Sequence, residues 1–276
     1  MSLDALPPLR EALADHGLLA KKSFGQHFLL DLNITRKIAR LAGPLEGHVA
    51  IEVGPGPGGL TRALLESDAA QVVAVEKDPR FLPLLAELAA AAPGRFTVVE
   101  ADALKVDEAA LARAAAPGAP LKIVANLPYN VGTPLLIKWL TGGLVWSGMA
   151  LMFQKEVAER IVAPAGSDAY GRLAVVAQAT SRPTLAMTLP ARAFTPPPKV
   201  DSAVVVLTPR DDAPAPELLK KLERVTAAAF GQRRKMLRSS LKQLGGAGLC
   251  EAAGIEPDAR AETVPVDGFL RLAAGL

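Results

Sequence analysis

Three glycines follow the first strongly apolar run of the chain at a spacing suited to nucleoside binding. Gly54, Gly56 and Gly59 form the pattern G-x-G-x-x-G inside IEVGPGPGGL, which leads from a predicted strand into a predicted helix. Glycine lets a backbone turn sharply and approach a ligand at a helix N-terminus. Glu76 ends the next predicted strand, where its carboxylate can accept hydrogen bonds from ribose hydroxyls. This order of elements favours a bound cofactor over a tight turn without a ligand.

Two further acids help to distinguish among nucleoside cofactors, because the glycine pattern alone suits both NAD and S-adenosylmethionine (SAM). Glu52 lies two residues before the first glycine, where a carboxylate can meet a cationic amino-acid group. Asp102 closes the third predicted strand and can accept a hydrogen bond from an adenine amino group. Asp102 can equally cap a following helix. Together the two acids favour SAM.

The segment Asn126-Leu127-Pro128-Tyr129 ends the fourth predicted strand, at the same sheet edge as the glycine loop. The Asn126 side-chain oxygen and the Leu127 carbonyl can accept the N–H bonds of an adenine amino group, which frees its lone pair. Pro128 stiffens the turn, and Tyr129 offers a face on which a base can stack. A sulfonium methyl group is already activated, so alignment and electrostatics would carry most of the reaction on an unpaired base. The alternative is that Asn126 caps the next helix and Tyr129 is a partly buried aromatic.

Alternating strand and helix patterns must position these residues. Predicted strands cover 48–54, 71–76, 96–102, 121–126 and 149–154, with helical patterns at 60–67, 79–92, 107–116 and 133–143 between them. Short strands separated by amphipathic helices predict βαβ units and a mostly parallel α/β sheet. Two later strands, 184–190 and 199–209, lack a helix-sized crossover, which predicts antiparallel pairing.

The character of the chain changes after Pro209. Residues 210–217 form a polar segment that contains prolines, and only helical patterns follow it, at 217–230 and 233–246. We therefore predict a first domain at 1–209, with an N-terminal arm at 1–24, and a small all-helical domain at 210–276.

Composition narrows the class of protein. Half of the 276 residues are hydrophobic, the formal net charge is +3, and Cys250 is the only cysteine. A lone cysteine excludes an intrachain disulfide and a thiolate-rich metal site, which agrees with a reducing cytoplasm. No apolar run reaches the length of a membrane span. We expect a cytoplasmic monomer without a metal.

A basic segment lies in the predicted helical domain. Residues 225–250 contain no Asp or Glu, and they include Arg233, Arg234, Lys235, Arg238 and Lys242. The spacing of four between Arg234, Arg238 and Lys242 predicts one helical face. Such a face is often only solvated, but the missing acids favour contacts with RNA phosphates. Lys21 and Lys22 can add a second basic contact.

Seven motifs, in order, resemble the KsgA (RsmA) family of small-subunit rRNA adenine dimethyltransferases. They are KKSFGQHFLLD (21–31), IEVGPGPGGLT (51–61), VANLPYN (124–130), MFQKEVAERIVA (152–163), YGRLAV (170–175), FTPPPKVDSAVV (194–205) and FGQRRKMLRSSL (230–241). The erythromycin-resistance 23S rRNA methyltransferases share the first four kinds of motif. The last motif is typical of the KsgA family and argues against them.

The resemblance implies a Rossmann-like class I SAM-dependent methyltransferase fold. Its sheet would have seven strands, mostly parallel with the last one antiparallel, and a small helical domain would follow. The implied activity is dimethylation of the N6 amino groups of two adjacent adenosines in the 3′-terminal hairpin loop of 16S rRNA. SAM would be converted to S-adenosylhomocysteine, and the substrate would be an immature small subunit.

The resemblance also implies roles for single residues. Gln26, His27 and Leu29 would line the methionine side of SAM, although the family often has Asn at the position of His27. The rest of the cofactor would be held by Glu52, Gly54, Gly56, Glu76, Asp102 and Asn126. Phe194 would be a second aromatic that sandwiches the target base against Tyr129, whereas its alternative is a core position at the start of a strand.

Three other functions are compatible with parts of the pattern. An NAD-dependent oxidoreductase would explain the glycines but not the segment from Asn126 to Tyr129. A non-catalytic RNA-binding assembly factor could keep the fold, although the intact acids and Asn126 argue against it. The third is methylation of another nucleic acid, 23S rRNA or DNA.

Overall fold

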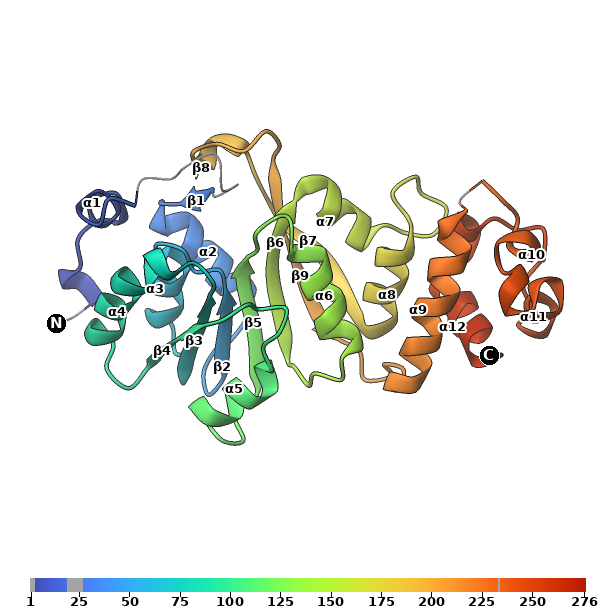
Figure 1. The fold of residues 1–276 in the computed structure, drawn as a ribbon, viewed down its shortest axis with the longest axis horizontal. Helices are drawn as coiled ribbons and strands as arrows, with labels where there is room; N and C mark the ends of the chain where they lie inside the picture. The colour runs from blue at the N-terminus through green and yellow to red at the C-terminus, as the bar shows by residue number, and fades with distance from the viewer. Residues whose placement is uncertain (1–2, 19–26, 233) are drawn as a thin grey trace. The chain divides into compact units, whose positions relative to one another are not determined.

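A computed structural model of the chain describes residues 3–18, 27–232 and 234–276 (Figure 1). The chain divides into two compact units. The first comprises Met1–Leu135, Leu144–Ala158 and Leu185–Leu207, and the second comprises Leu136–Gly143, Glu159–Thr184 and Thr208–Leu276. The division is not a single cut in the chain, and the domain boundary between residues 209 and 210 stays a prediction.

Seven strands of the described residues form one sheet in the order β4-β3-β2-β5-β6-β9-β7. Their bounds are β2 (Val49–Val53), β3 (Gln71–Glu76), β4 (Phe96–Glu100), β5 (Leu121–Asn126), β6 (Gly148–Gln154), β7 (Ser181–Leu189) and β9 (Ser202–Pro209). The strands from β4 to β6 pair in parallel, whereas β9 runs antiparallel to β6 with Met152 opposite Val204. This arrangement confirms the predicted mostly parallel α/β sheet with an antiparallel last strand.

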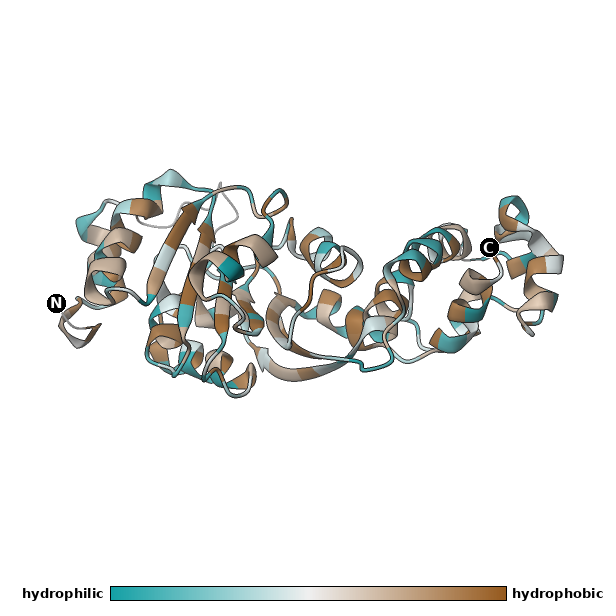
Figure 2. Ribbon diagram, turned by 90° about the horizontal axis from the view of Figure 1, so that it is seen from below, coloured by the Kyte–Doolittle hydropathy of each residue, from teal (hydrophilic) through white to brown (hydrophobic). Residues whose placement is uncertain are grey.

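Burial on both faces explains why the central strands read as continuous apolar runs. Every residue of β2 is buried, and β5 is buried up to its last residue, Asn126. Strands inside a parallel sheet are covered by helices on both sides, so alternation of polar and apolar residues is lost. Figure 2 shows hydrophobic residues on the strands and both kinds of residue on the helices.

The helices up to residue 162 are α1 (Leu9–Asp15), α2 (Leu32–Leu41), α3 (Gly59–Leu65), α4 (Leu82–Ala91), α5 (Glu108–Ala115), α6 (Gly132–Thr141) and α7 (Lys155–Val162). The helices α3 to α6 occur at the predicted positions, and α4 is preceded by a 3-10 turn at Pro79–Phe81. Helix α2 was not predicted. It begins after Asp31, whose side chain accepts a hydrogen bond from the Asn33 N–H, and it contacts α3 and β6.

A second, two-stranded sheet lies in the first unit. It pairs β1 (Phe28–Leu29) with β8 (Phe194–Thr195), antiparallel, with Leu29 opposite Phe194. Two-residue strands leave no periodic signal in a sequence, so this pairing was not predicted. It ties the segment before α2 to the connection between β7 and β9.

The helices of the second unit are α8 (Arg172–Thr180), α9 (Pro216–Gly231), α10 (Leu237–Ser240), α11 (Gly246–Ala252) and α12 (Val266–Ala274). Short 3-10 turns occur at Lys242–Leu244 and Ala261–Thr263. Helix α9 contacts α8 and α12 around a core that includes Tyr170, Leu222, Val225 and Phe269. The predicted helical character of the C-terminal region is confirmed.

The predicted continuous helix at 233–246 is wrong. Helix α9 ends at Gly231, and the next helix starts only at Leu237. The N–H of Leu237 donates to the Ala259 carbonyl, and the N–H of Arg238 donates to the Pro257 carbonyl. These long-range bonds fix the start of α10, so Arg234 does not share a helical face with Arg238 and Lys242.

Candidate active site

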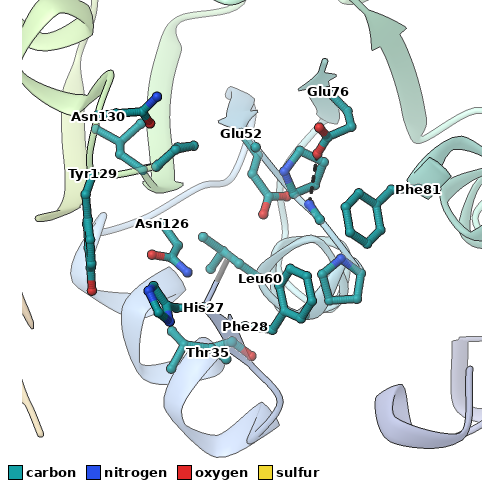
Figure 3. A pocket seen from close by; sticks show the side chains of 18 residues that line it. His27, Phe28, Thr35, Glu52, Leu60, Glu76, Phe81, Asn126, Tyr129 and Asn130 are labelled. Carbon is teal, nitrogen blue, oxygen red and sulfur yellow. Dashed lines mark hydrogen bonds between the residues drawn. The ribbon is translucent and has the colours of Figure 1, made fainter. Parts of the chain in front are cut away.

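One pocket of the first unit, with a volume of about 520 Å³, lies at the carboxyl ends of the parallel strands. The walls come from residues 27–29, from Thr35 of α2, and from the segments that end or follow β2, β3 and β5 (Figure 3). In open α/β sheets this edge is where ligands bind. The predicted site residues on its walls are His27, Leu29, Glu52, Gly54, Gly56, Glu76, Asn126, Leu127, Pro128 and Tyr129.

The glycine loop shapes the floor of the pocket. Gly54 has φ +69° and Gly56 has φ +52°, a backbone region that favours glycine. At Gly59 the requirement is space, because an added Cβ would lie 2.6 Å from the Leu29 carbonyl oxygen. An added Cβ at Gly54 would lie 3.3 Å from the ring of Pro128. The glycines therefore let Leu29 and Pro128, from two distant segments, pack closely against the loop.

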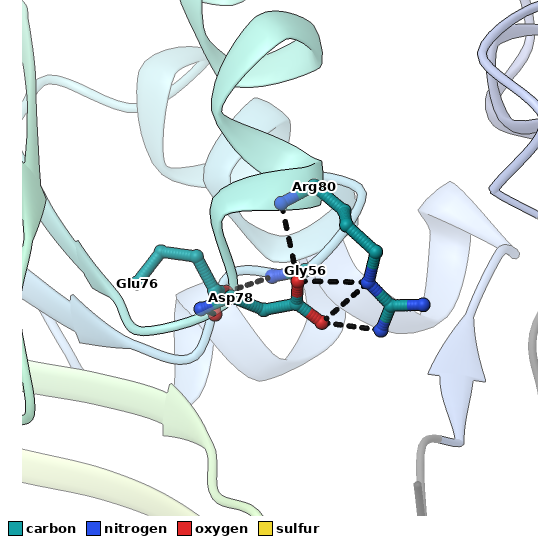
Figure 4. A network of polar contacts seen from close by, with 4 residues as sticks. All are labelled: Gly56, Glu76, Asp78 and Arg80. Atoms are coloured by element: carbon teal, nitrogen blue, oxygen red, sulfur yellow. Dashed lines mark hydrogen bonds and ion pairs between the residues drawn. The ribbon is translucent and has the colours of Figure 1, made fainter.

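Glu76 is held by the backbone of two loops. One carboxylate oxygen accepts from the Gly56 N–H at 3.1 Å, and the other accepts from the Asp78 N–H at 2.8 Å (Figure 4). Asp78 is itself bound by the guanidinium of Arg80, with 2.9 Å between Nε and Oδ1. Burial raises the pKa of Glu76, and the backbone N–H bonds oppose that shift. Backbone N–H groups of Gly56, Lys77 and Asp78 do not use all four lone pairs of the carboxylate, so it can still accept from a ligand hydroxyl.

Glu52 is a nearly fully buried carboxyl on the pocket wall, with 1% of its surface exposed. Its Oε2 accepts a hydrogen bond of 2.6 Å from the Thr61 hydroxyl. Burial raises the pKa of Glu52 to about 8; the bond from Thr61 lowers it and the nearby charge of Glu76 raises it. The described residues that line the pocket include no Lys or Arg. Two carboxyls without a basic partner favour a positively charged ligand.

Asp102 does not line the pocket. Its carboxylate accepts from the Leu104 N–H at 3.1 Å and from the Lys77 ammonium at 2.9 Å, and Lys77 lowers its pKa. The alternative that Asp102 caps a helix is wrong, because Asp107 caps α5 by accepting from the Ala110 N–H. Contact between Asp102 and a cofactor stays a prediction.

Asn126 and Tyr129 lie on the pocket wall at the end of β5. Figure 3 shows the Asn126 amide near the middle of the pocket and the Tyr129 ring at its side. The hydroxyls of Tyr129 and Ser202 lie 2.7 Å apart, and burial raises the pKa of Tyr129. Asn126 does not cap α6, because that helix begins only at Gly132. The amide therefore lines the pocket instead of capping a helix, and its contact with a ligand stays a prediction.

His27 and Phe194 have different surroundings. The Nδ1 of His27 lies 2.8 Å from the Pro196 carbonyl oxygen, which can only accept, so the contact places a proton on Nδ1. Its ring faces Tyr129, with 5.8 Å between centroids and 29° between planes. Phe194 is 3% exposed and belongs to the core of the first unit. This burial agrees with the alternative that Phe194 is a core residue at the start of a strand. Its role beside a target base stays a prediction.

Several pocket residues were not predicted. Phe28 and Phe81 meet edge to face, with 5.6 Å between ring centroids, and both line the pocket. Other unpredicted wall residues are Thr35, Pro55, Pro57, Leu60 and Asn130. No local pattern distinguishes these residues from ordinary core or loop positions, because only the fold brings them together.

The predicted RNA-binding residues are described in part. Arg234, Lys235, Arg238 and Lys242 are exposed, whereas Lys21, Lys22, Gln26 and Arg233 lie outside the described residues. Arg238 forms an ion pair of 2.9 Å with Asp258. Residues 225–250 contain no acid, but folding brings Asp258 next to Arg238.

Neither a metal cluster nor a membrane span occurs in the part of the chain that the structure describes. No three His, Cys, Asp or Glu side chains of these residues are grouped so that they could hold a metal ion. None of the helices formed by these residues is long and apolar enough to cross a membrane.

Known proteins resemble the chain over nearly its whole length. The family model for ribosomal RNA adenine dimethylase matches residues 17–276. The ribosomal RNA small subunit methyltransferase A of Phenylobacterium zucineum (strain HLK1) is 68% identical over 273 residues, which cover 99% of this chain and 94% of that protein.

Two solved structures share the fold. A dimethyladenosine transferase from Plasmodium falciparum has a TM-score of 0.72 at 24% identity, covering 89% of this chain and 96% of its own. The 23S rRNA methyltransferase ErmE has a TM-score of 0.67 at 26% identity, covering 90% and 99%. The predicted Rossmann-like methyltransferase fold is confirmed. With its family model and its full-length relatives in agreement, the chain belongs to the ribosomal RNA adenine dimethylase family.

Proposed function

We propose that this chain uses SAM to dimethylate the N6 amino groups of two adjacent adenosines in the 3′-terminal hairpin loop of 16S rRNA. Membership of the adenine dimethylase family and the small-subunit name of a 68% identical relative support this reaction and substrate. The observation that carries it is the pocket, where Asn126 and Tyr129 meet the glycine loop and two buried acids.

The pocket suits SAM by shape and charge. Glycines permit the close backbone approach that a nucleoside needs, and Glu76 retains acceptor capacity for ribose hydroxyls. Glu52 lies in the same pocket, where a carboxylate can meet the ammonium of the methionine end. His27 and Leu29 would line that end, together with Gln26. An NAD-dependent oxidoreductase would leave the position of Asn126 unexplained.

Transfer needs an amino group held in line with an activated methyl group, which SAM supplies on its sulfonium. The Asn126 side-chain oxygen and the Leu127 carbonyl accept the two N–H bonds of the target adenine, so the nitrogen lone pair turns toward the methyl carbon. Tyr129 supports the base by stacking, worth about 1–3 kcal/mol per base. Pro128 restricts the turn that holds these groups. As the N–C bond forms, the C–S bond breaks and the nitrogen becomes positively charged; it then loses its proton readily to water, so alignment and hydrogen bonding replace a strong general base.

The substrate is proposed to be an immature small subunit, bound by a monomer in the cytoplasm. The relative's name supports rRNA of the small subunit rather than 23S rRNA. Exposed Arg234, Lys235, Arg238 and Lys242 are available for rRNA phosphates, and Arg233, Lys21 and Lys22 would extend that contact. In this scheme residues 1–209 carry catalysis and residues 210–276 bind RNA. The single buried Cys250 agrees with a reducing compartment.

Primer extension tests the proposed position of the reaction. Two methyl groups on N6 remove the donors needed for Watson–Crick pairing, so reverse transcriptase should stop at the modified adenosines. We expect two adjacent stops in the 3′-terminal hairpin after small subunits lacking the modification are incubated with the protein and SAM. Absence of stops there, with stops elsewhere in small- or large-subunit rRNA, would overturn the proposal.

A further inference from the structure

Thr61 is buried, yet its hydroxyl is directed at a wall of the pocket. It is the third residue of α3, is 0% exposed, and donates to Glu52 Oε2 at 2.6 Å. Among the described residues, this is the one hydrogen bond that reaches the Glu52 carboxyl. Thr61 does not line the pocket, whereas Glu52 does.

Among the residues that the structure describes, Thr61 is the hydrogen-bond partner of the Glu52 carboxyl, and no basic side chain is paired with it. The next residue, Arg62, directs its guanidinium to the Pro7 carbonyl, with 2.7 Å between Nη1 and the oxygen. From β3, Glu76 adds a like charge. His27 lies on the pocket wall and donates from Nδ1 to Pro196. The threonine hydroxyl is therefore the local donor that favours the ionised carboxylate.

The two oxygens of the Glu52 carboxylate have different surroundings. Oε2 accepts from Thr61, and Glu52 lines the pocket, so Oε1 is the oxygen that remains available to a ligand. A β-branched side chain is restricted at χ1 in a helix, and Thr61 is 0% exposed, so its hydroxyl has little room to leave Glu52. A carboxylate fixed at one oxygen keeps the other in a defined direction.

We propose that Thr61 is a positioning residue of the cofactor pocket: it holds Glu52 so that the free oxygen meets the positively charged methionine end of SAM. This inference rests on the proposed SAM-dependent function. It predicts that SAM binding releases a proton from Glu52, because burial raises the pKa of this carboxyl to about 8. Removing the hydroxyl removes an interaction that lowers this pKa, so binding should then require a higher pH.

The test compares Thr61→Val, which keeps the shape without the donor, with Thr61→Ser, which keeps the donor. Isothermal titration with SAM from pH 6 to pH 10, in buffers of different ionisation enthalpy, gives both affinity and protons released. We expect Thr61→Val to bind SAM about 10-fold more weakly at pH 7, the loss of a hydrogen bond to a charged group. Its pH profile should shift to higher pH, and Thr61→Ser should restore both.

Several outcomes would overturn the inference. Unchanged affinity and an unchanged pH profile in Thr61→Val would do so, and so would a loss that is equal at every pH and not restored by Ser. If Thr61→Val does not fold, judged by thermal unfolding, Thr61→Ala serves as the second variant under the same criteria. Methyl transfer to rRNA is measured separately. If Thr61→Val weakens SAM binding but the unaltered protein transfers no methyl group to rRNA, the inference holds and only the proposed function fails. If the unaltered protein does not bind SAM, both fail.

Discussion

Replacing Glu52 with glutamine should change how the stability of the SAM-free protein depends on pH. Burial raises the pKa of Glu52 from its ordinary value of 4.5 to about 8. Below pH 4.5 the carboxyl is protonated in folded and unfolded chains, so it has no effect on unfolding. Between pH 4.5 and 8 the unfolded chain ionises first, and the free energy of unfolding falls. Above pH 8 the loss is complete.

The size of this loss follows from the shift. About 3.5 pKa units at about 1.4 kcal/mol each give about 5 kcal/mol above pH 8. Since a cavity adjoins the carboxyl, solvation lowers this figure, and we expect a difference of about 2–5 kcal/mol. The side-chain amide of the E52Q protein stays neutral, and its oxygen can still accept from the Thr61 hydroxyl. The E52Q protein should therefore gain stability relative to the unaltered protein as pH rises.

Urea unfolding at pH 5, 7 and 9 measures this difference directly. The difference between E52Q and the unaltered protein isolates Glu52, because all other groups titrate in both. Glu100→Gln, at an exposed glutamate of β4, is the matched control and should show no such trend. A difference for E52Q that stays constant from pH 5 to pH 9 would mean that the pKa of Glu52 is not raised in the folded protein.

Substitutions at Asn126, at Gly59 and in the basic segment test the transfer chemistry, the glycine loop and the RNA contact. Asn126→Ala should keep SAM binding largely intact, since other residues also hold the cofactor, and lower methyl transfer about 100-fold, the usual loss for one aligned polar group; unchanged turnover in single-turnover assays would remove it from the reaction. Gly59→Ala places a Cβ against the Leu29 carbonyl and should cost about 1–3 kcal/mol in urea unfolding, so undiminished stability would argue against this close approach. Arg234→Glu with Arg238→Glu should weaken binding to small subunits and reduce the slope of log affinity against log salt by about 1–2. If affinity and slope do not change, the basic segment is only solvated surface.

The central sheet could be read from the sequence because its signals are local. Strand β5 has the predicted bounds, Leu121–Asn126, since a largely apolar run lies between Pro120 and the Leu-Pro pair that follows. Parallel strands buried on both faces produce such runs directly. The predicted helix at 233–246 failed for the opposite reason. Its break depends on carbonyls at Pro257 and Ala259, which no local pattern reveals.

In the candidate site too, residues with a local sequence signal could be predicted and residues brought together only by folding could not. The glycines and acids carry their chemistry in their spacing, so most of them were expected at the pocket. Phe28 and Phe81 were not, because two ordinary aromatics far apart in the sequence meet only after folding. Phe194, in contrast, was predicted at the site from its motif, but in the structure it pairs through β8 with β1 and lies in the core.

The identity of the methylated nucleoside, and of the particle that carries it, decides whether this chain dimethylates adenosine in small-subunit rRNA. Labelled SAM is offered with the protein to small subunits from cells lacking this modification, to naked 16S rRNA and to large subunits, and the RNA is digested to nucleosides. We predict labelled N6,N6-dimethyladenosine from small subunits alone, and none from naked 16S rRNA or large subunits. Label in large subunits, or binding to small subunits without any dimethyladenosine, would contradict it.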